Sequence, residues 1–121
     1  MKQFLAITKA LSDETRVRAL LSLRKGELCL CQIIDLLRMA PSTVSKHMEL
    51  LHQAGLVERR KEGRWQYFRL AKKDALPNIR QALAWTLKAL ETEPIVTADA
   101  KQLCCIRKKD LEEVCSCYRG S

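Results

Sequence analysis

The fold of this chain is decided by residues 41–51, which read PSTVSKHMELL. The first of them, proline, suits the first turn of a helix, where its missing N–H would have no partner in any case. Apolar Val44, Met48 and Leu51 recur at i, i+4 and i+7, which predicts a helix with one buried stripe. We expect this helix to continue to Gln53, with Gly55 as the residue that stops it.

The residues on either side predict four more helices and a β-hairpin. Apolar stripes at helical spacing predict helices at 2–11, from Ser12 as N-cap to Lys25-Gly26, from about Leu28 to Leu37, and at 77–91. A change to a period of two predicts strands at 56–60 and 64–70 around a turn at 61–63. Two helices joined by a three-residue break and followed by a hairpin are typical of a winged helix-turn-helix. The predicted fold class is mainly α (α+β), with a two-stranded wing and flanking helices.

Hydroxyl and basic side chains lie where such a fold would meet DNA. Short hydroxyls and a lysine near a helix N-terminus suit base edges and phosphates in a major groove, and basic residues at a hairpin tip suit phosphates or a minor groove. The net charge of +8 favours a polyanionic partner, although residues 41–70, with six basic and three acidic residues, carry only +3. A basic surface can also be an ordinary solvated face, so the order of the elements carries the assignment. The candidate DNA-binding residues are Ser42, Thr43, Ser45, Lys46, His47, Arg60, Lys61 and Arg64, with Arg59 beside them.

Length and composition indicate one globular unit in a reducing compartment. The chain has 121 residues, 47% hydrophobic and 30% charged. It holds no apolar run of membrane-spanning length and no signal-peptide core, so we expect a cytoplasmic protein without a membrane partner and with its six cysteines reduced. We divide it into a DNA-binding and dimerisation domain at 1–91 and a cysteine-rich C-terminal tail at 92–121.

Residues 9–70 resemble the ArsR/SmtB family of small dimeric winged-helix metalloregulators. The resemblance rests on four phrases in family order and spacing, at 9–18, 27–31, 41–51 and 63–70. It implies a homodimeric repressor, not an enzyme, that binds double-stranded operator DNA and leaves it when an effector binds. The predicted helices at 2–11 and 77–91 fit the dimerisation elements of the family. The resemblance fades after about residue 91.

The phrase at 27–31, ELCLC, resembles the arsenical and antimonial branch of the family, whose effectors are arsenite and antimonite. Trivalent arsenic is thiophilic, so Cys29 and Cys31 are the primary candidate ligands. At i and i+2 of a regular helix two side chains point about 200° apart, so both reach one ion only through local unwinding or a non-helical helix start. The alternative is that both are small buried hydrophobic residues. Members of this branch often carry a third cysteine three residues later, where this chain has Ile34.

The last thirty residues hold four further cysteines, Cys104-Cys105 and Cys115-Ser116-Cys117. They could supply a third ligand, form a second site with Cys104 and Cys105 as secondary candidates, or do nothing. A thiol redox or persulfide switch on the same fold is the alternative function. A thiol enzyme is disfavoured because the chain has no Cys-x-x-Cys and no thioredoxin-like pattern. Zinc is disfavoured by the resemblance, because zinc-responsive members of the family use His and Asp or Glu on the last helix, whereas residues 77–91 contain no His, no Asp and only Glu91.

Overall fold

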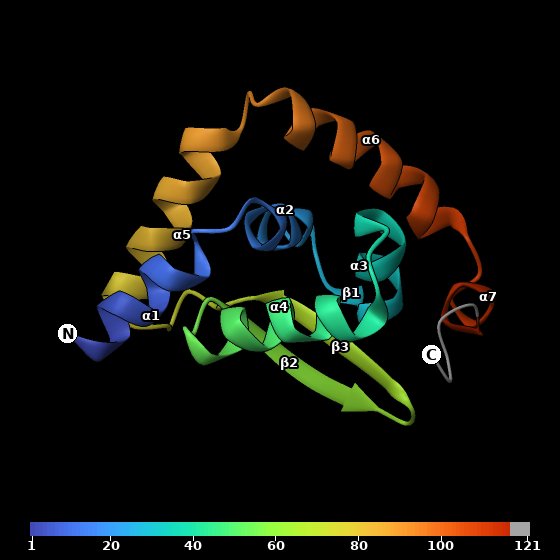
Figure 1. Cartoon of the computed structure of the whole chain (residues 1–121), viewed down its shortest axis with the longest axis horizontal. Helices are drawn as coiled ribbons and strands as arrows, with labels where there is room; N and C mark the ends of the chain where they lie inside the picture. The colour runs from blue at the N-terminus through green and yellow to red at the C-terminus, as the bar shows by residue number, and fades with distance from the viewer. Residues whose placement is uncertain (117–121) are drawn as a thin grey trace.

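The computed structural model describes residues 1–116, with α5 and α6 forming an arch over α2 and α3 (Figure 1). The sheet and its hairpin lie on the opposite side of α2 from the top of the arch. The elements in chain order are α1 (Lys2–Ala10), α2 (Glu14–Ser22), β1 (Leu28–Cys29), α3 (Leu30–Leu37), α4 (Pro41–Gln53), β2 (Val57–Glu62), β3 (Trp65–Leu70), α5 (Pro77–Leu90), α6 (Pro94–Lys108) and α7 (Leu111–Ser116).

The helix-turn-helix formed by α3 and α4 is confirmed. Helix α3 ends at Arg38, whose φ of 54° and ψ of 44° are left-handed, and the Arg38 N–H donates to the Ile34 carbonyl at 2.8 Å. Helix α4 then begins with proline, and its predicted stripe of Val44, Met48 and Leu51 is fully buried. Burial of this stripe leaves the opposite face of α4 on the surface.

Gly55 ends α4 as predicted, for two physical reasons. Its φ of +84° is a conformation that favours glycine. A Cβ at this position would also lie 2.6 Å from Cδ1 of Ile79, on α5. The turn between α4 and the hairpin therefore packs directly against α5.

The predicted two-stranded wing is confirmed as β2 and β3, and a short strand that was not predicted, β1, joins it to give a sheet of order β1-β3-β2. Strand β1 pairs antiparallel with β3, placing Leu28 opposite Phe68 and Cys29 opposite Tyr67. The helix expected from about Leu28 therefore begins only at Leu30. A two-residue strand has no periodicity of its own, and its pairing with β3 is a contact between residues about forty apart.

Two local expectations also need correction. The hairpin turn is shorter than 61–63, because Glu62 pairs with Trp65 and only Gly63-Arg64 connect the strands. The N-cap of α2 is Asp13, whose Oδ2 accepts from the Arg16 N–H at 3.0 Å, whereas the Ser12 hydroxyl donates to the Lys9 carbonyl of the preceding turn.

Helices α6 and α7 were not predicted; both lie in the segment, 92–121, that was assigned to a cysteine-rich tail. Leu103 and Ile106 of α6 belong to the same buried cluster as the helix-turn-helix. Helix α6 packs against α2 and α3, and α7 packs against α3. A bidentate ion pair between Arg18 of α2 and Asp99 of α6, at 2.8 and 2.9 Å, fixes α6 further, and it raises the pKa of Arg18. Within residues 1–116 no helix is both long enough and apolar enough to cross a membrane.

Candidate functional site

The outward face of α4 carries the predicted hydroxyl and basic residues. Ser42, Ser45 and Lys46 are exposed, while Thr43 and His47 are half-buried. The ring of His47 contacts α2, because its Nδ1 lies 3.3 Å from Nη1 of Arg16, within hydrogen-bond distance.

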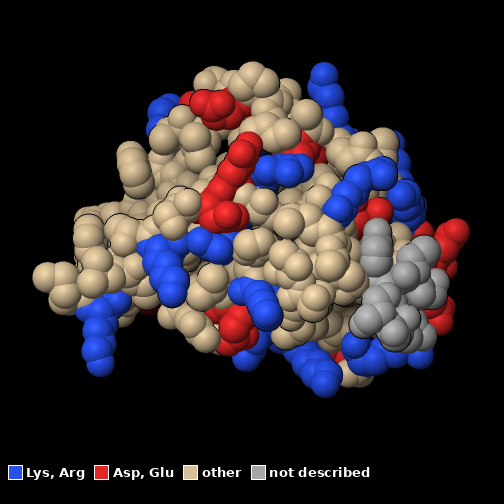
Figure 2. Space-filling model, in the orientation of Figure 1, with Lys and Arg blue, Asp and Glu red and all other residues tan. Residues whose placement is uncertain are grey.

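The basic residues of the wing differ in how they are engaged. Arg59 pairs with Glu49 at 2.6 Å, and Arg64 pairs with Glu112 of α7 at 3.2 Å. Lys61 is exposed, and within residues 1–116 no ion pair holds it. Basic and acidic side chains are scattered over the face shown in Figure 2, across its middle as well as along its edge, and do not gather into one patch. Charge alone therefore does not define a DNA surface.

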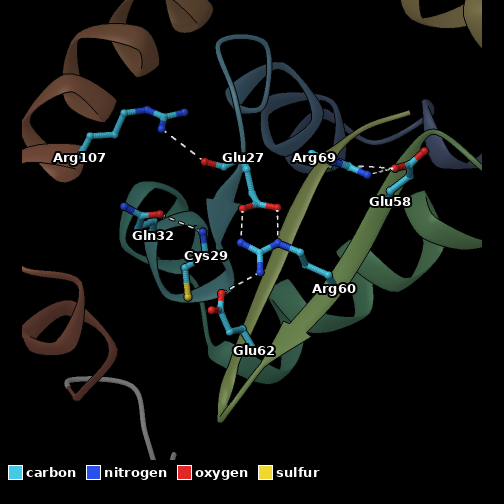
Figure 3. A network of polar contacts seen from close by, with 8 residues as sticks. All are labelled: Glu27, Cys29, Gln32, Glu58, Arg60, Glu62, Arg69 and Arg107. Carbon is cyan, nitrogen blue, oxygen red and sulfur yellow. Dashed lines mark hydrogen bonds and ion pairs between the residues drawn. The ribbon is translucent and has the colours of Figure 1, made fainter. Parts of the chain in front are cut away.

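Arg60 joins the wing to the residues just before β1 (Figure 3). Its guanidinium donates to both carboxylate oxygens of Glu27, at 2.7 and 2.9 Å, and to Glu62 at 2.8 Å. It also lies over the ring of Tyr67, 4.4 Å from the centroid. These hydrogen bonds raise the pKa of Arg60 and hold the pKa of Glu27 below its usual range.

Arg107 of α6 reaches the same segment from the other side. Its guanidinium donates to the backbone carbonyls of Gly26 and Glu27 at 3.3 and 3.4 Å. Sequence reasoning missed both Glu27 and Arg107 as parts of the site. Arg107 lies 80 positions from Glu27, and no local pattern signals a contact at that separation.

Cys29 is buried and stands outside α3 as its N-cap, with φ −72° and ψ 149°. Its backbone N–H donates to Oε1 of Gln32 at 2.8 Å, which completes a capping box at the start of α3. Cys31 follows in the first turn of α3 and is half-buried. Of the two routes by which the pair could reach one ion, the non-helical helix start is the one present.

The other cysteines are distributed unevenly. Cys104 and Cys105 are exposed on α6, and Cys104 lines a cavity of about 230 Å³ between α2 and α6. Among the side chains described, no three His, Cys, Asp or Glu residues come together as a metal site. Cys115 lies in α7 with an undescribed side chain, and Cys117 lies outside the described residues.

A tight helix-turn-helix with exposed hydroxyls and a lysine on its second helix, flanked by a hairpin, defines a winged helix-turn-helix DNA-binding protein. The family model described as "Bacterial regulatory protein, arsR family" matches residues 13–59. The arsenical resistance operon repressor of Escherichia coli K12 is 33% identical over 112 residues, which cover 89% of this chain and 92% of that protein. The chain belongs to the ArsR family and is a transcriptional regulator rather than an enzyme.

Two further comparisons agree with this family assignment. The arsenic resistance transcriptional regulator ArsR1 of Pseudomonas putida is 40% identical over 65 residues, and the match spans 53% of this chain and about half, 51%, of that protein. A homodimeric winged helix-turn-helix domain from Mycobacterium bovis, a possible ArsR-family regulator, superposes with a TM-score of 0.63 at 28% identity. That superposition covers 77% of this chain and 82% of the other.

Proposed function

We propose that this protein is a homodimeric repressor that binds operator DNA and leaves it when trivalent arsenic or antimony binds the thiolates of Cys29 and Cys31. The position of Cys29 carries the proposal. This residue pairs with Tyr67 of the wing strand and caps α3, which packs against α4. A ligand on its sulfur therefore acts where the wing and the helix-turn-helix meet. The arsenical resistance repressors among the relatives support the effector class.

The DNA surface in this proposal is the outer face of α4 together with the wing. Ser42, Ser45 and Lys46 are exposed and free to meet base edges and phosphates, with Thr43 and His47 beside them. On the wing, Lys61 is available for phosphate, and Arg64 is available when its exposed pair with Glu112 opens. Arg60 acts at the DNA surface chiefly by holding the wing to Glu27.

The dimer surface in this proposal is formed by α1 and α5, which pack side by side. Phe4 and Leu5 of α1 are 60% and 54% exposed, and Trp85 of α5 is 70% exposed. Large apolar side chains this exposed on two adjacent helices fit an interface. A second copy of the chain is the partner that the homodimeric structural neighbour supports.

Effector binding is coupled to release through the start of α3. Although Cys29 already stands outside the regular helix, it is buried, so in this proposal the ion draws its sulfur outwards towards Cys31; this movement breaks the capping box with Gln32 and strains the pairing with Tyr67. The distortion reaches the wing through β3 and the second DNA-reading helix through α3. A coupling free energy of about 3 kcal/mol shifts operator affinity more than a hundredfold.

The test is an operator mobility shift with arsenite, antimonite, methylarsenite, cadmium and zinc, each under strong reductant. We expect arsenite and antimonite to release the operator, because a soft trivalent ion prefers thiolates. Release only by oxidants or persulfide donors, reversed by reductant, would instead support the thiol redox or persulfide switch. Release by zinc or cadmium but not by arsenite would contradict the proposed effector.

A further inference from the structure

The cavity between α2 and α6 has no part in the proposed function. It has a volume of about 230 Å³, and the residues of α6 that line it run from Val96 in the first turn to Arg107 in the last. They recur every three or four positions over three turns, so the cavity is elongated along one face of the helix. Its lining includes neither Cys29 nor Cys31 and no residue of α4, so it is separate from the thiol pair and from the DNA surface.

The middle of this cavity is apolar. Leu21 of α2 and Val96 and Leu103 of α6 line it, and each of these side chains is at most 7% exposed. The hydroxyl of Ser22, also in the lining, already donates to the Ala19 carbonyl within α2. A methylene is about as large as a water, which occupies about 30 Å³, so the volume suits an unbranched chain of about seven or eight carbons.

One end of the cavity is cationic. Arg24 and Lys25, in the loop after α2, line it together with Arg107, and all three are exposed. Arg107 lies beside this loop, because it donates to the Gly26 carbonyl at 3.3 Å and also points to the Glu27 carbonyl (Figure 3). Within residues 1–116 no ion pair holds any of these three cations.

The acidic residue in the lining, Asp99, does not oppose an anion. Its two carboxylate oxygens accept from the guanidinium of Arg18 at 2.9 and 2.8 Å, so this pair is neutral as a whole. The charge of the lining is then that of the three cations at the loop end. An elongated apolar cavity with cations at one end complements a carboxylate that carries a hydrocarbon chain.

We propose that the cavity between α2 and α6 binds a medium-chain carboxylate, with its chain along Leu21, Val96 and Leu103 and its carboxylate at Arg24, Lys25 and Arg107. The chain removes apolar surface from water along its whole length. The guanidinium of Arg107 can donate two parallel, charge-assisted hydrogen bonds to a carboxylate, which are stronger than its long contacts with backbone carbonyls. This site goes beyond the proposed function and does not depend on arsenic binding.

The test is a calorimetric titration of the full-length protein with octanoate, under reductant and without DNA. We expect saturable binding of one octanoate per chain, with a Kd below about 1 mM. Octylamine, which has a chain of the same length and the opposite charge, and acetate, which lacks the chain, should not saturate in this range. Arg24→Ala/Lys25→Ala should weaken octanoate binding on the order of tenfold or more, because it removes two of the three cations. The matched control is Arg80→Ala, which removes an exposed cation of α5 outside the cavity and should leave the affinity unchanged.

Two adjacent thiols locate the bound octanoate. Cys104 and Cys105 are both exposed, but only Cys104 lines the cavity. Octanoate should therefore slow the alkylation of Cys104 by iodoacetamide severalfold and leave that of Cys105 unchanged, as measured by tandem mass spectrometry.

The site would be overturned by any of four results: no saturable octanoate binding below about 1 mM, equal binding of octylamine, wild-type affinity in Arg24→Ala/Lys25→Ala, or equal protection of both thiols. Failure of the proposed function has a separate signature. The Cys29→Ser/Cys31→Ser variant should bind octanoate like the wild type, whether or not arsenite releases its operator.

Discussion

Glu27 is the residue that holds the segment before β1 against the wing. Both oxygens of its carboxylate accept from the guanidinium of Arg60, and its backbone carbonyl accepts from Arg107. Glu27, two residues before Cys29 in the chain, is therefore fixed to β2 through Arg60 and to α6 through Arg107. Movement of Cys29 must be transmitted through these contacts or break them.

The Glu27–Arg60 pair predicts a pH dependence of stability. Hydrogen bonds from Arg60 hold the pKa of Glu27 below its ordinary value of about 4.5. The unfolded chain then binds more protons as the pH falls below 4.5, so the stabilisation is complete above this pH and is lost as the pH falls through the folded-state pKa. In Glu27→Gln we expect the free energy of unfolding to decline less steeply below about pH 4.5, measured by urea denaturation between pH 7 and 3. Glu93→Gln, at an exposed position, is the control, and equal acid slopes in wild type and Glu27→Gln would count against the pair.

Lys46 predicts a salt-dependent contribution to operator binding. It is exposed on α4, and if it meets a phosphate, Lys46→Ala should lower operator affinity and reduce the slope of log K against log salt by about one. Lys101→Ala, on the exposed face of α6, should change neither quantity. Binding titrations at several salt concentrations measure both, and an unaltered slope in Lys46→Ala would mean that the DNA face lies elsewhere.

At the scale of elements, the parts predicted correctly from sequence are those with strong local patterns. Helix α4 has a proline start, a clean apolar stripe and a glycine stop, and the hairpin has period-two alternation around Gly63. Strand β1 could not be predicted in this way, since it exists through its pairing with β3. Helix α6 carried a usable signal in its proline start at Pro94 and in Val96, Leu103 and Ile106, which lie at the spacing of one apolar face. Charged residues and two cysteines lie between those positions, and the segment was assigned to the cysteine-rich tail rather than to a helix.

Helix α6 predicts that part of the cysteine-rich segment is needed for stability. Ile106 is 0% exposed and belongs to the main core cluster. Ile106→Ala should lower the free energy of unfolding by about 2–5 kcal/mol, because it leaves a cavity in that core. Cys105→Ala, one residue away and exposed, should change it by less than about 0.5 kcal/mol. Urea denaturation of both variants measures the difference, and a negligible loss in Ile106→Ala would show that α6 does not contribute to the core.

At the scale of the whole molecule, the chain has an apolar surface at one end and a DNA surface on one side. Helices α1 and α5 lie together at one end, with α7 at the other (Figure 1). Dimerisation through α1 and α5 would position the two copies of α4 so that each contacts one half-site of an inverted repeat. Such half-sites are about 34–36 Å apart, or a little more.

This arrangement predicts that a charge on α1 separates the dimer. Leu5→Glu should shift the protein towards a folded monomer at micromolar concentration, because it buries a charge in an apolar interface. Operator affinity should also fall, because a monomer contacts only one half-site. Ile95→Glu, a similar change on α6, should leave the dimer intact. Sedimentation equilibrium reports both, and a wild-type protein that is a folded monomer at micromolar concentration would contradict the proposed assembly.

The central claim is that arsenic acts through Cys29 and Cys31, and the most direct test is operator release by arsenite in the Cys29→Ser/Cys31→Ser variant under reductant. Serine is a favourable N-cap and nearly isosteric with cysteine, so the variant should fold and bind operator like the wild type. A hydroxyl is a poor ligand for a soft ion, so arsenite should no longer release it. An operator complex of this variant that dissociates at the same arsenite concentration as the wild type would contradict the account.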